Sequence, residues 1–210
     1  MTAIAARASA TRKIALLLAA ALSACVPATF TSEAVASVNV APPQDGAAGL
    51  CEREIQSAAA KYGIPEGILY SVGLTETGRK GSLYPYALNI EGKPVFPPSE
   101  NAALQTFVEA KQSGAKLIDI GCMQINQYFH GENFASVADM FDPHHNVEYA
   151  ARFLRDLHDR HETWTMAVAR YHAGPNNDPA QKVYVCRVIA NLVATGYGKW
   201  TPNAATFCQN

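Results

Sequence analysis

One acidic side chain in this sequence lies on an apolar helix face, a setting that suits a proton donor. Residues 64–78 predict a helix, with Pro65 inside its first turn and a glycine just past its end. Ile68, Val72 and Glu76 are spaced four residues apart, so they share one face. Apolar surroundings and the negative end of the helix dipole both raise the pKa of Glu76, as a general acid near neutral pH requires. The alternative is a solvent-facing glutamate at a frayed helix end.

The apolar periodicity of the remaining chain predicts a mostly helical domain around this acid. Helical patterns cover residues 51–62, 100–113, 147–157, 164–173 and 185–195. Two extended runs, 84–90 and 93–96, flank Glu91-Gly92 and predict a hairpin in which Pro94 confines its strand to the edge. Residues 116–120 predict another strand. We therefore expect an α+β fold that is predominantly α, with a small sheet element.

Composition limits the classes of function. The chain has 210 residues, about half of them apolar, which is room for one domain and an extension. Its net charge is −1, but Arg7, Arg12 and Lys13 lie in a segment expected to be removed. Without these three of the 17 basic residues, 14 remain against 18 acidic ones, a net charge of −4. This balance argues against binding nucleic acid through phosphate neutralisation.

The first 25 residues predict an export signal. A basic segment ends at Lys13, and the apolar run 14–24 is too short to span a membrane. Leu22-Ser23-Ala24-Cys25 resembles a bacterial lipoprotein cleavage box, so we expect lipidated Cys25 to anchor a periplasmic protein to the outer membrane. The alternative is an ordinary signal peptide cut after Ala36. Residues 26–50, rich in Ala, Pro, Ser, Thr and Val, are expected to form a flexible linker.

Cysteine usage fits an exported domain. Lipidation of Cys25 leaves four cysteines, an even number that predicts two disulfides with three alternative connectivities. We expect Cys51 to pair with Cys122 and Cys186 with Cys208, the second pair folding the C-terminal tail along the last helix. A zinc site is the alternative, but the sequence has no CxxC pair to support it.

Three separated segments resemble the signature blocks of the soluble lytic transglycosylase (SLT) domain, a relative of goose-type lysozyme. They are Glu76-Thr77-Gly78, Gly121-Cys122-Met123-Gln124-Ile125-Asn126 and Ala169-Arg170-Tyr171-His172-Ala173-Gly174. In the family they read approximately Glu-Ser-Gly, Gly-Leu-Met-Gln-Ile and Ala-x-x-Tyr-Asn-x-Gly. The segment 141–147 also resembles the family's Asp-Pro-x-x-Asn turn. The resemblance covers roughly residues 51–195, so we expect a lysozyme-like SLT domain over 51–197 and a tail over 198–210.

The blocks depart from the family pattern at three positions. Thr77 replaces serine and keeps a hydroxyl group, and Cys122 replaces leucine, which suits a disulfide. His172 stands where the family usually has asparagine. The chain between Glu76 and Gly121 is also longer than in minimal family members, and it contains the predicted hairpin and a helix.

The resemblance implies cleavage of the β-1,4 bond between N-acetylmuramic acid and N-acetylglucosamine in peptidoglycan. Glu76 would protonate the leaving oxygen and then accept the proton of the sugar's 6-hydroxyl, which closes a 1,6-anhydro ring without a cofactor. Sugar-binding roles follow from the resemblance for Thr77, Met123, Gln124, Asn126, Tyr171 and His172. Asn89, which follows Tyr84 and Tyr86, is expected to line the sugar groove. Tyr171 is expected to place its hydroxyl near Glu76, and its alternative is packing in the core beside Trp164.

Other readings remain open. Asp119, two residues before Gly121, is a candidate second carboxylate of a hydrolytic muramidase. A non-catalytic glycan-binding scaffold of an envelope machine is a further alternative, although a pure binder needs no acid on an apolar face. The histidines at 144, 145, 158 and 161 lack the pattern of a metal site, so we expect no metal. Peptidoglycan is the expected partner, together with the membrane and proteins of a secretion, conjugation or flagellar apparatus.

Overall fold

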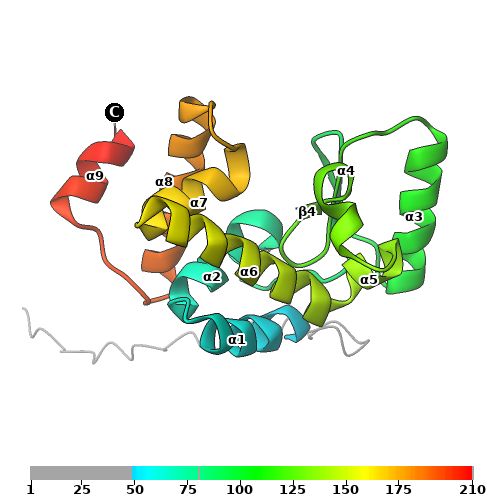
Figure 1. Cartoon of the computed structure of the whole chain (residues 1–210), viewed down its shortest axis with the longest axis horizontal. Coiled ribbons are helices and arrows are strands. Elements are labelled where there is room, and N and C mark those ends of the chain that lie inside the picture. The colour runs from blue at the N-terminus through cyan, green and yellow to red at the C-terminus, as the bar shows by residue number, and fades with distance from the viewer. Residues whose placement is uncertain (1–48, 80, 210) are drawn as a thin grey trace, which may run out of the picture. The chain divides into compact units, whose positions relative to one another are not determined.

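The computed structural model describes residues 49–79 and 81–209, and Figure 1 shows their arrangement. The helices are α1 (Leu50–Tyr62), α2 (Glu66–Thr77), α3 (Glu100–Gln112), α4 (Gln127–His130), α5 (Val137–Phe141), α6 (Pro143–His161), α7 (Trp164–Ala173), α8 (Asp178–Ala194) and α9 (Pro202–Gln209), with a 3-10 turn at Gly131–Asn133. The strands are β1 (Leu88–Ile90), β2 (Lys93–Val95), β3 (Ile118–Ile120) and β4 (Ile125–Asn126). The predicted α+β class, predominantly α, is confirmed.

The four strands form one antiparallel sheet in the order β2-β1-β3-β4. The expected hairpin is present, and its turn at Glu91-Gly92 has φ angles of 51° and 83°. Pro94 lies on the edge strand, where its missing N–H costs no ladder bond. The register places Asn89 opposite Asp119 and Asp119 opposite Asn126. Because cross-strand partners share a face, these three side chains form a polar row.

The helices pack around α2 and α6. Helix α6 crosses the front of the view in Figure 1, with α1 below it and α2 behind it. Contacts join α6 to α1 and α7, and they join α2 to α1 and α8. Leu69 and Val72 of α2, Met123 of the loop before β4, and Leu154 of α6 are fully buried in the resulting core. The carboxyl-terminal end of α2 therefore lies between α8 and the sheet.

The cysteines pair as expected. Cys51 of α1 is bonded to Cys122, and their Cα atoms are 5.7 Å apart. Cys186 of α8 is bonded to Cys208 of α9, with 5.6 Å between the Cα atoms. The second disulfide holds the C-terminal tail, which forms a helix, against α8.

Some local predictions were wrong. Helix α2 begins at Glu66, and Pro65 occupies the N-cap position instead of the first turn. The short elements α4, α5, α9 and β4 were not predicted, because two to eight residues carry too little periodicity to be recognised. Within the described ranges, no helix is long and apolar enough to cross a membrane. The predicted export signal, Cys25 and the linker up to residue 48 lie outside the described residues.

Candidate active site

The carboxyl group of Glu76 lies at the end of α2 in surroundings that favour its neutral form. Burial, with a smaller contribution from the negative charge of Asp119, raises the pKa of Glu76 to about 8. The hydroxyl of Tyr184 donates a hydrogen bond to Oε1 at 2.5 Å, which acts in the opposite direction. Burial is the larger effect. Glu76 as a whole is half-buried, so its carboxyl group combines a protein environment with partial access.

Tyr184 is the direct partner of Glu76, and sequence reasoning missed it. It lies on α8 within the apolar stripe that also contains Val185 and Val188. The residue is buried, and burial raises its pKa well above the ordinary value, so its hydroxyl stays protonated. A buried tyrosine needs a partner for its hydroxyl group. That general requirement was the available signal, but it does not name the partner.

Asp119 belongs to the same site through the polar row of the sheet. Asn126 donates a hydrogen bond from Nδ2 to Asp119 Oδ1 at 2.6 Å, while burial raises the pKa of Asp119. Asn126 Oδ1 also accepts the backbone N–H groups of Tyr128 and Phe129 at 3.1 and 3.3 Å. Asn89 completes the row, and its Oδ1 is buried without a hydrogen-bond partner among the described residues. The amide of Asn126 is therefore engaged within the protein.

The loop from Gly121 to Asn126 is held by a buried asparagine. Asn146 Nδ2 donates to the carbonyls of Ile120 and Met140, both at 2.9 Å, and its Oδ1 accepts Met123 N–H at 2.9 Å. Gly121 has a φ of 81°, and a Cβ atom there would lie 2.5 Å from Asn146 Nδ2. Glycine is required by both the backbone conformation and the space. This contact explains why the Asp-Pro-x-x-Asn turn accompanies the loop.

Three predicted sugar-binding residues hold this loop in place. Gln124 has a φ of 48° and donates from Nε2 to the carbonyls of Ala87 and Gly121 at 3.2 and 3.1 Å. Thr77 is buried and donates to the Cys122 carbonyl at 3.0 Å. Met123 is fully buried. The side chains of Thr77 and Met123 are thus not presented to solvent, whereas Gln124 is half-buried and keeps Oε1 free of any protein donor in the described chain.

Tyr171 and His172 lie one contact away from Glu76. The Tyr171 hydroxyl donates to the Met123 carbonyl at 2.8 Å. Burial raises the pKa of Tyr171, and the charge of Glu76 adds to this effect, so the two residues are neighbours. His172 stacks on Tyr184 with 4.2 Å between ring centroids and 2° between planes. Burial lowers the pKa of His172, which favours a neutral ring against Tyr184.

His144 and His145 form contacts typical of a protein surface. His144 Nδ1 lies 2.8 Å from Glu54 Oε2, and His145 contacts Asp139. In the described part of the chain, no group of three His, Cys, Asp or Glu side chains is placed to hold a metal ion. The zinc alternative also loses its ligands, because the four cysteines described here are all bonded in disulfides.

This arrangement can donate and recover a proton near neutral pH. Glu76 is protonated below about pH 8, and Tyr184 remains hydrogen-bonded to it after the proton leaves. Asp119 is a second acid in the same electrostatic environment. General-acid cleavage of an acetal or glycoside is the chemistry that such a pair of groups supports.

Comparison with known protein families gives the class. The model of the transglycosylase SLT domain matches residues 53–186, well over half of the chain. The chain belongs to this family, which has a lysozyme-like fold and cleaves peptidoglycan in the periplasm. No curated protein and no solved structure matches the chain.

Proposed function

We propose that this protein is a lytic transglycosylase that cleaves the β-1,4 bond between N-acetylmuramic acid and N-acetylglucosamine and leaves 1,6-anhydro ends. The observation that carries the proposal is the carboxyl group of Glu76, whose pKa is raised to about 8 while Tyr184 holds its Oε1. Family membership supplies the substrate class, peptidoglycan. No cofactor enters the proposed reaction.

In the proposed reaction one carboxyl group handles both proton transfers. Neutral Glu76 protonates the glycosidic oxygen, the bond to the anomeric carbon breaks, and the substrate's own acetamido group stabilises the resulting positive charge. The carboxylate of Glu76 then removes the proton of the 6-hydroxyl, and O6 bonds to the anomeric carbon. Glu76 ends protonated, as it began. The Tyr184 hydroxyl stabilises the intermediate carboxylate, since hydrogen bonds to charged acceptors are the stronger kind.

Other groups take supporting roles in this proposal. Gln124 Oε1 accepts a hydrogen bond from a substrate N–H or O–H group, while its Nε2 stays bonded to the loop. Asn89 and Asn126 act through the polar row that fixes Asp119. Tyr171 fixes the Met123 carbonyl, and His172 supports the ring of Tyr184.

A hydrolytic muramidase is the second candidate, and one observation favours it. Asp119 lies close enough for its charge to raise the pKa of Glu76. Retaining and inverting glycosidases use a second carboxylate as nucleophile or base, a role that Asp119 would take here. The two candidates differ in product, since a hydrolase leaves reducing N-acetylmuramic acid ends.

One digestion separates these candidates. Purified peptidoglycan is incubated with the wild type, Glu76→Gln and Asp119→Asn, and the released muropeptides are identified by mass. We expect 1,6-anhydro products from the wild type and from Asp119→Asn, and none from Glu76→Gln. Reducing-end products that disappear in Asp119→Asn would establish the muramidase instead. No release by the wild type would leave the glycan-binding scaffold as the better explanation.

We also propose that the protein acts as an exported lipoprotein, anchored to the outer membrane through Cys25 and a linker over residues 26–50. The support is the sequence pattern, because these residues lie outside the described structure. Mass analysis of the mature N-terminus tests it. A diacylglyceryl cysteine at position 25, absent from Cys25→Ala, is the expected result, and a mature chain that begins at Ser37 would exclude it. We include in this proposal that the protein opens peptidoglycan for a secretion, conjugation or flagellar apparatus.

A further inference from the structure

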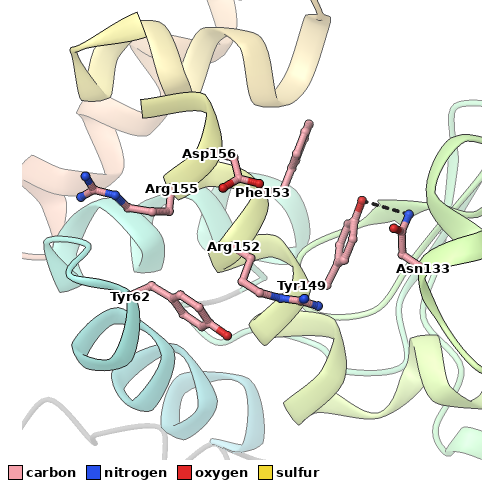
Figure 2. Close-up of a pocket in the computed structure, with 7 residues that line it drawn as sticks. All are labelled: Tyr62, Asn133, Tyr149, Arg152, Phe153, Arg155 and Asp156. Carbon is pink, nitrogen blue, oxygen red and sulfur yellow. Dashed lines mark hydrogen bonds between the residues drawn. The ribbon is translucent and has the colours of Figure 1, made fainter. Parts of the chain in front are cut away.

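A pocket of about 400 Å³ lies on α6, and the proposed reaction does not use it. Its lining comes from the end of α1, the 3-10 turn and α6, as Figure 2 shows. The lining residues are Tyr62, Asn133, Tyr149, Arg152, Phe153, Arg155 and Asp156. Aromatic walls with two guanidinium groups and one carboxylate are a combination suited to a charged organic ligand.

Arg152 is the cation of this pocket that has no acidic partner. Its guanidinium lies 5.9 Å from the centroid of the Tyr149 ring, and Figure 2 shows it extended between Tyr62 and Tyr149. No ion pair of Arg152 is found within residues 49–79 and 81–209. Arg155, by contrast, is paired with Asp159 outside the pocket. The pocket therefore presents one exposed, uncompensated guanidinium group.

The acids that line this pocket and the one beside it are engaged in other contacts, apart from one. An adjoining pocket of about 310 Å³ also includes Arg152, and it contains Asp139 and Glu148. Asp139 contacts His145, and Glu148 accepts hydrogen bonds from Lys61 and Tyr62. Asp156 remains, exposed and one helical turn beyond Arg152 on α6. The pocket thus offers a guanidinium and a carboxylate that do not pair with each other.

Aromatic contacts connect this pocket to the candidate active site. The rings of Tyr149 and Phe153 are stacked at 6.3 Å, and Phe153 lies 5.7 Å from the ring of Tyr171. Tyr171 in turn holds the Met123 carbonyl. The charge of Tyr149 also contributes to the raised pKa of Tyr171, which places the two hydroxyl groups near each other. Packed aromatic rings therefore join the pocket to the candidate active site.

We propose that the pocket binds the stem peptide of peptidoglycan, with Arg152 holding a peptide carboxylate and Asp156 holding an ammonium group. This proposal rests on the proposed function, because it concerns the same substrate. In intact peptidoglycan the lactyl carboxyl group of muramic acid is bonded to the peptide. The sugar chain then offers hydroxyl and acetamido groups, whereas the stem peptide carries free carboxylates and amines. Guanidinium groups bind carboxylates through charge-assisted hydrogen bonds, so an unpaired arginine selects the peptide over the sugar.

The test compares peptidoglycan with glycan strands from which an amidase has removed the peptides. We expect Arg152→Ala to lower kcat/KM on intact peptidoglycan roughly fivefold, the effect of about 1 kcal/mol for an exposed charge pair. Under the proposal, its activity on naked glycan, where the amidase leaves only a lactyl carboxylate on muramic acid, should equal that of the wild type. The loss should shrink in high salt, since exposed charges are screened. Arg152→Lys should retain part of the effect, and Arg160→Ala, which removes an exposed arginine of α6 outside the pocket, is the matched control.

A binding measurement keeps the proposal testable without catalysis. In the Glu76→Gln background, Arg152→Ala should reduce sedimentation with intact peptidoglycan and leave sedimentation with naked glycan unchanged. Equal losses on both substrates, or no loss on either, would overturn the peptide site while the proposed reaction stands. Absence of product from the wild type would instead defeat the proposed reaction, and the sedimentation arm would still decide on the pocket. Thermal unfolding of each variant excludes loss of the fold as the cause.

Discussion

Glu76 and Glu148 each accept a hydrogen bond from a tyrosine hydroxyl, and yet their pKa values are shifted in opposite directions. Tyr184 donates to Glu76 at 2.5 Å, and Tyr62 donates to Glu148 at 2.7 Å. The pKa of Glu76 is raised to about 8 by burial, whereas the pKa of Glu148 is lowered to about 2, first by its bond to Lys61. A tyrosine hydroxyl therefore bonds to a carboxyl group that is neutral near pH 7 in Glu76 and to one that is charged in Glu148.

The two pKa shifts differ because Glu148 is partly exposed to solvent and paired with a cation, whereas the carboxyl group of Glu76 is buried and has no cation beside it. Lys61 Nζ lies 2.9 Å from Glu148, and water reaches this pair on the surface of α1 and α6. Glu76 has no cation among its described contacts, and the charge that acts on its pKa is that of the acid Asp119. The tyrosine lowers the pKa in both cases, but it cannot outweigh burial at Glu76. The raised pKa of the proposed catalytic acid is thus caused by the surroundings of its carboxyl group, and the tyrosine limits how far this pKa rises.

The largest expected effect comes from removing the titrating proton. Glu76→Gln should reduce the release of muropeptides by a factor of about 10² to 10⁴, the usual contribution of a general acid. Glu148→Gln should leave the rate unchanged, because its carboxylate is engaged at the surface by Lys61 and Tyr62. Rates of peptidoglycan solubilisation measure both. A Glu76→Gln rate within tenfold of the wild type would contradict the assignment.

The second effect is on stability. Because the pKa of Glu76 rises from 4.5 to about 8 on folding, the unfolded chain ionises first and wild-type stability falls between these pH values. Glutamine does not titrate, so Glu76→Gln should gain a few kcal/mol over the wild type between pH 4.5 and pH 8. Urea unfolding at pH 5 and at pH 8 measures the difference. A gap that stays constant with pH would show that the carboxyl group is not neutral in the folded protein.

The third effect separates the two neighbours of Glu76. Tyr184→Phe removes the bond that lowers the pKa of Glu76, so the alkaline limb of activity should move to higher pH. Asp119→Asn removes the charge that raises that pKa, so the limb should move to lower pH. Each displacement should be on the order of one pH unit. The pH profile of kcat/KM reports both, and shifts in the same direction would refute this account of the site.

The smallest effect belongs to Glu148. Its lowered pKa stabilises the fold above the unfolded value of 4.5, and this contribution is lost as the pH falls towards 2. Glu148→Gln should cost less than about 1 kcal/mol near neutral pH, since solvent screens the pair. The difference from the wild type should vanish in acid. Thermal unfolding of both proteins at pH 7 and pH 3 measures this difference in stability. If the difference changes mainly between pH 5 and pH 8, a group other than Glu148 causes it.

Much of the fold was predictable because its signals are local. The spacing of Ile68, Val72 and Glu76 placed the acid on a buried helix face, and the even cysteine count led to both disulfides. The hairpin followed from the turn at Glu91-Gly92. Each of these features can be predicted from a few neighbouring residues or from the count of one residue type.

The polar contacts of the site could not be predicted in the same way. Tyr184 reaches Glu76 across 108 positions of sequence, and its own stripe is that of an ordinary core helix. The direction of the Gln124 amide depends on a backbone φ of 48°, which no periodicity encodes. Tyr171 was expected to lie near Glu76, but the acceptor of its hydroxyl group, the Met123 carbonyl, could not be named from the sequence. Long-range packing chooses between such partners, so sequence alone leaves them open.

The disulfide between Cys51 and Cys122 also determines how the domain bears mechanical load. Cys51 is the second residue of α1, so a pull on the preceding chain meets a covalent bond within the first turn of the helix. That bond passes the force to Cys122, whose carbonyl group holds Thr77 at the end of α2. Tension therefore enters through the centre of the domain and beside its acid, and α1 cannot be peeled away turn by turn.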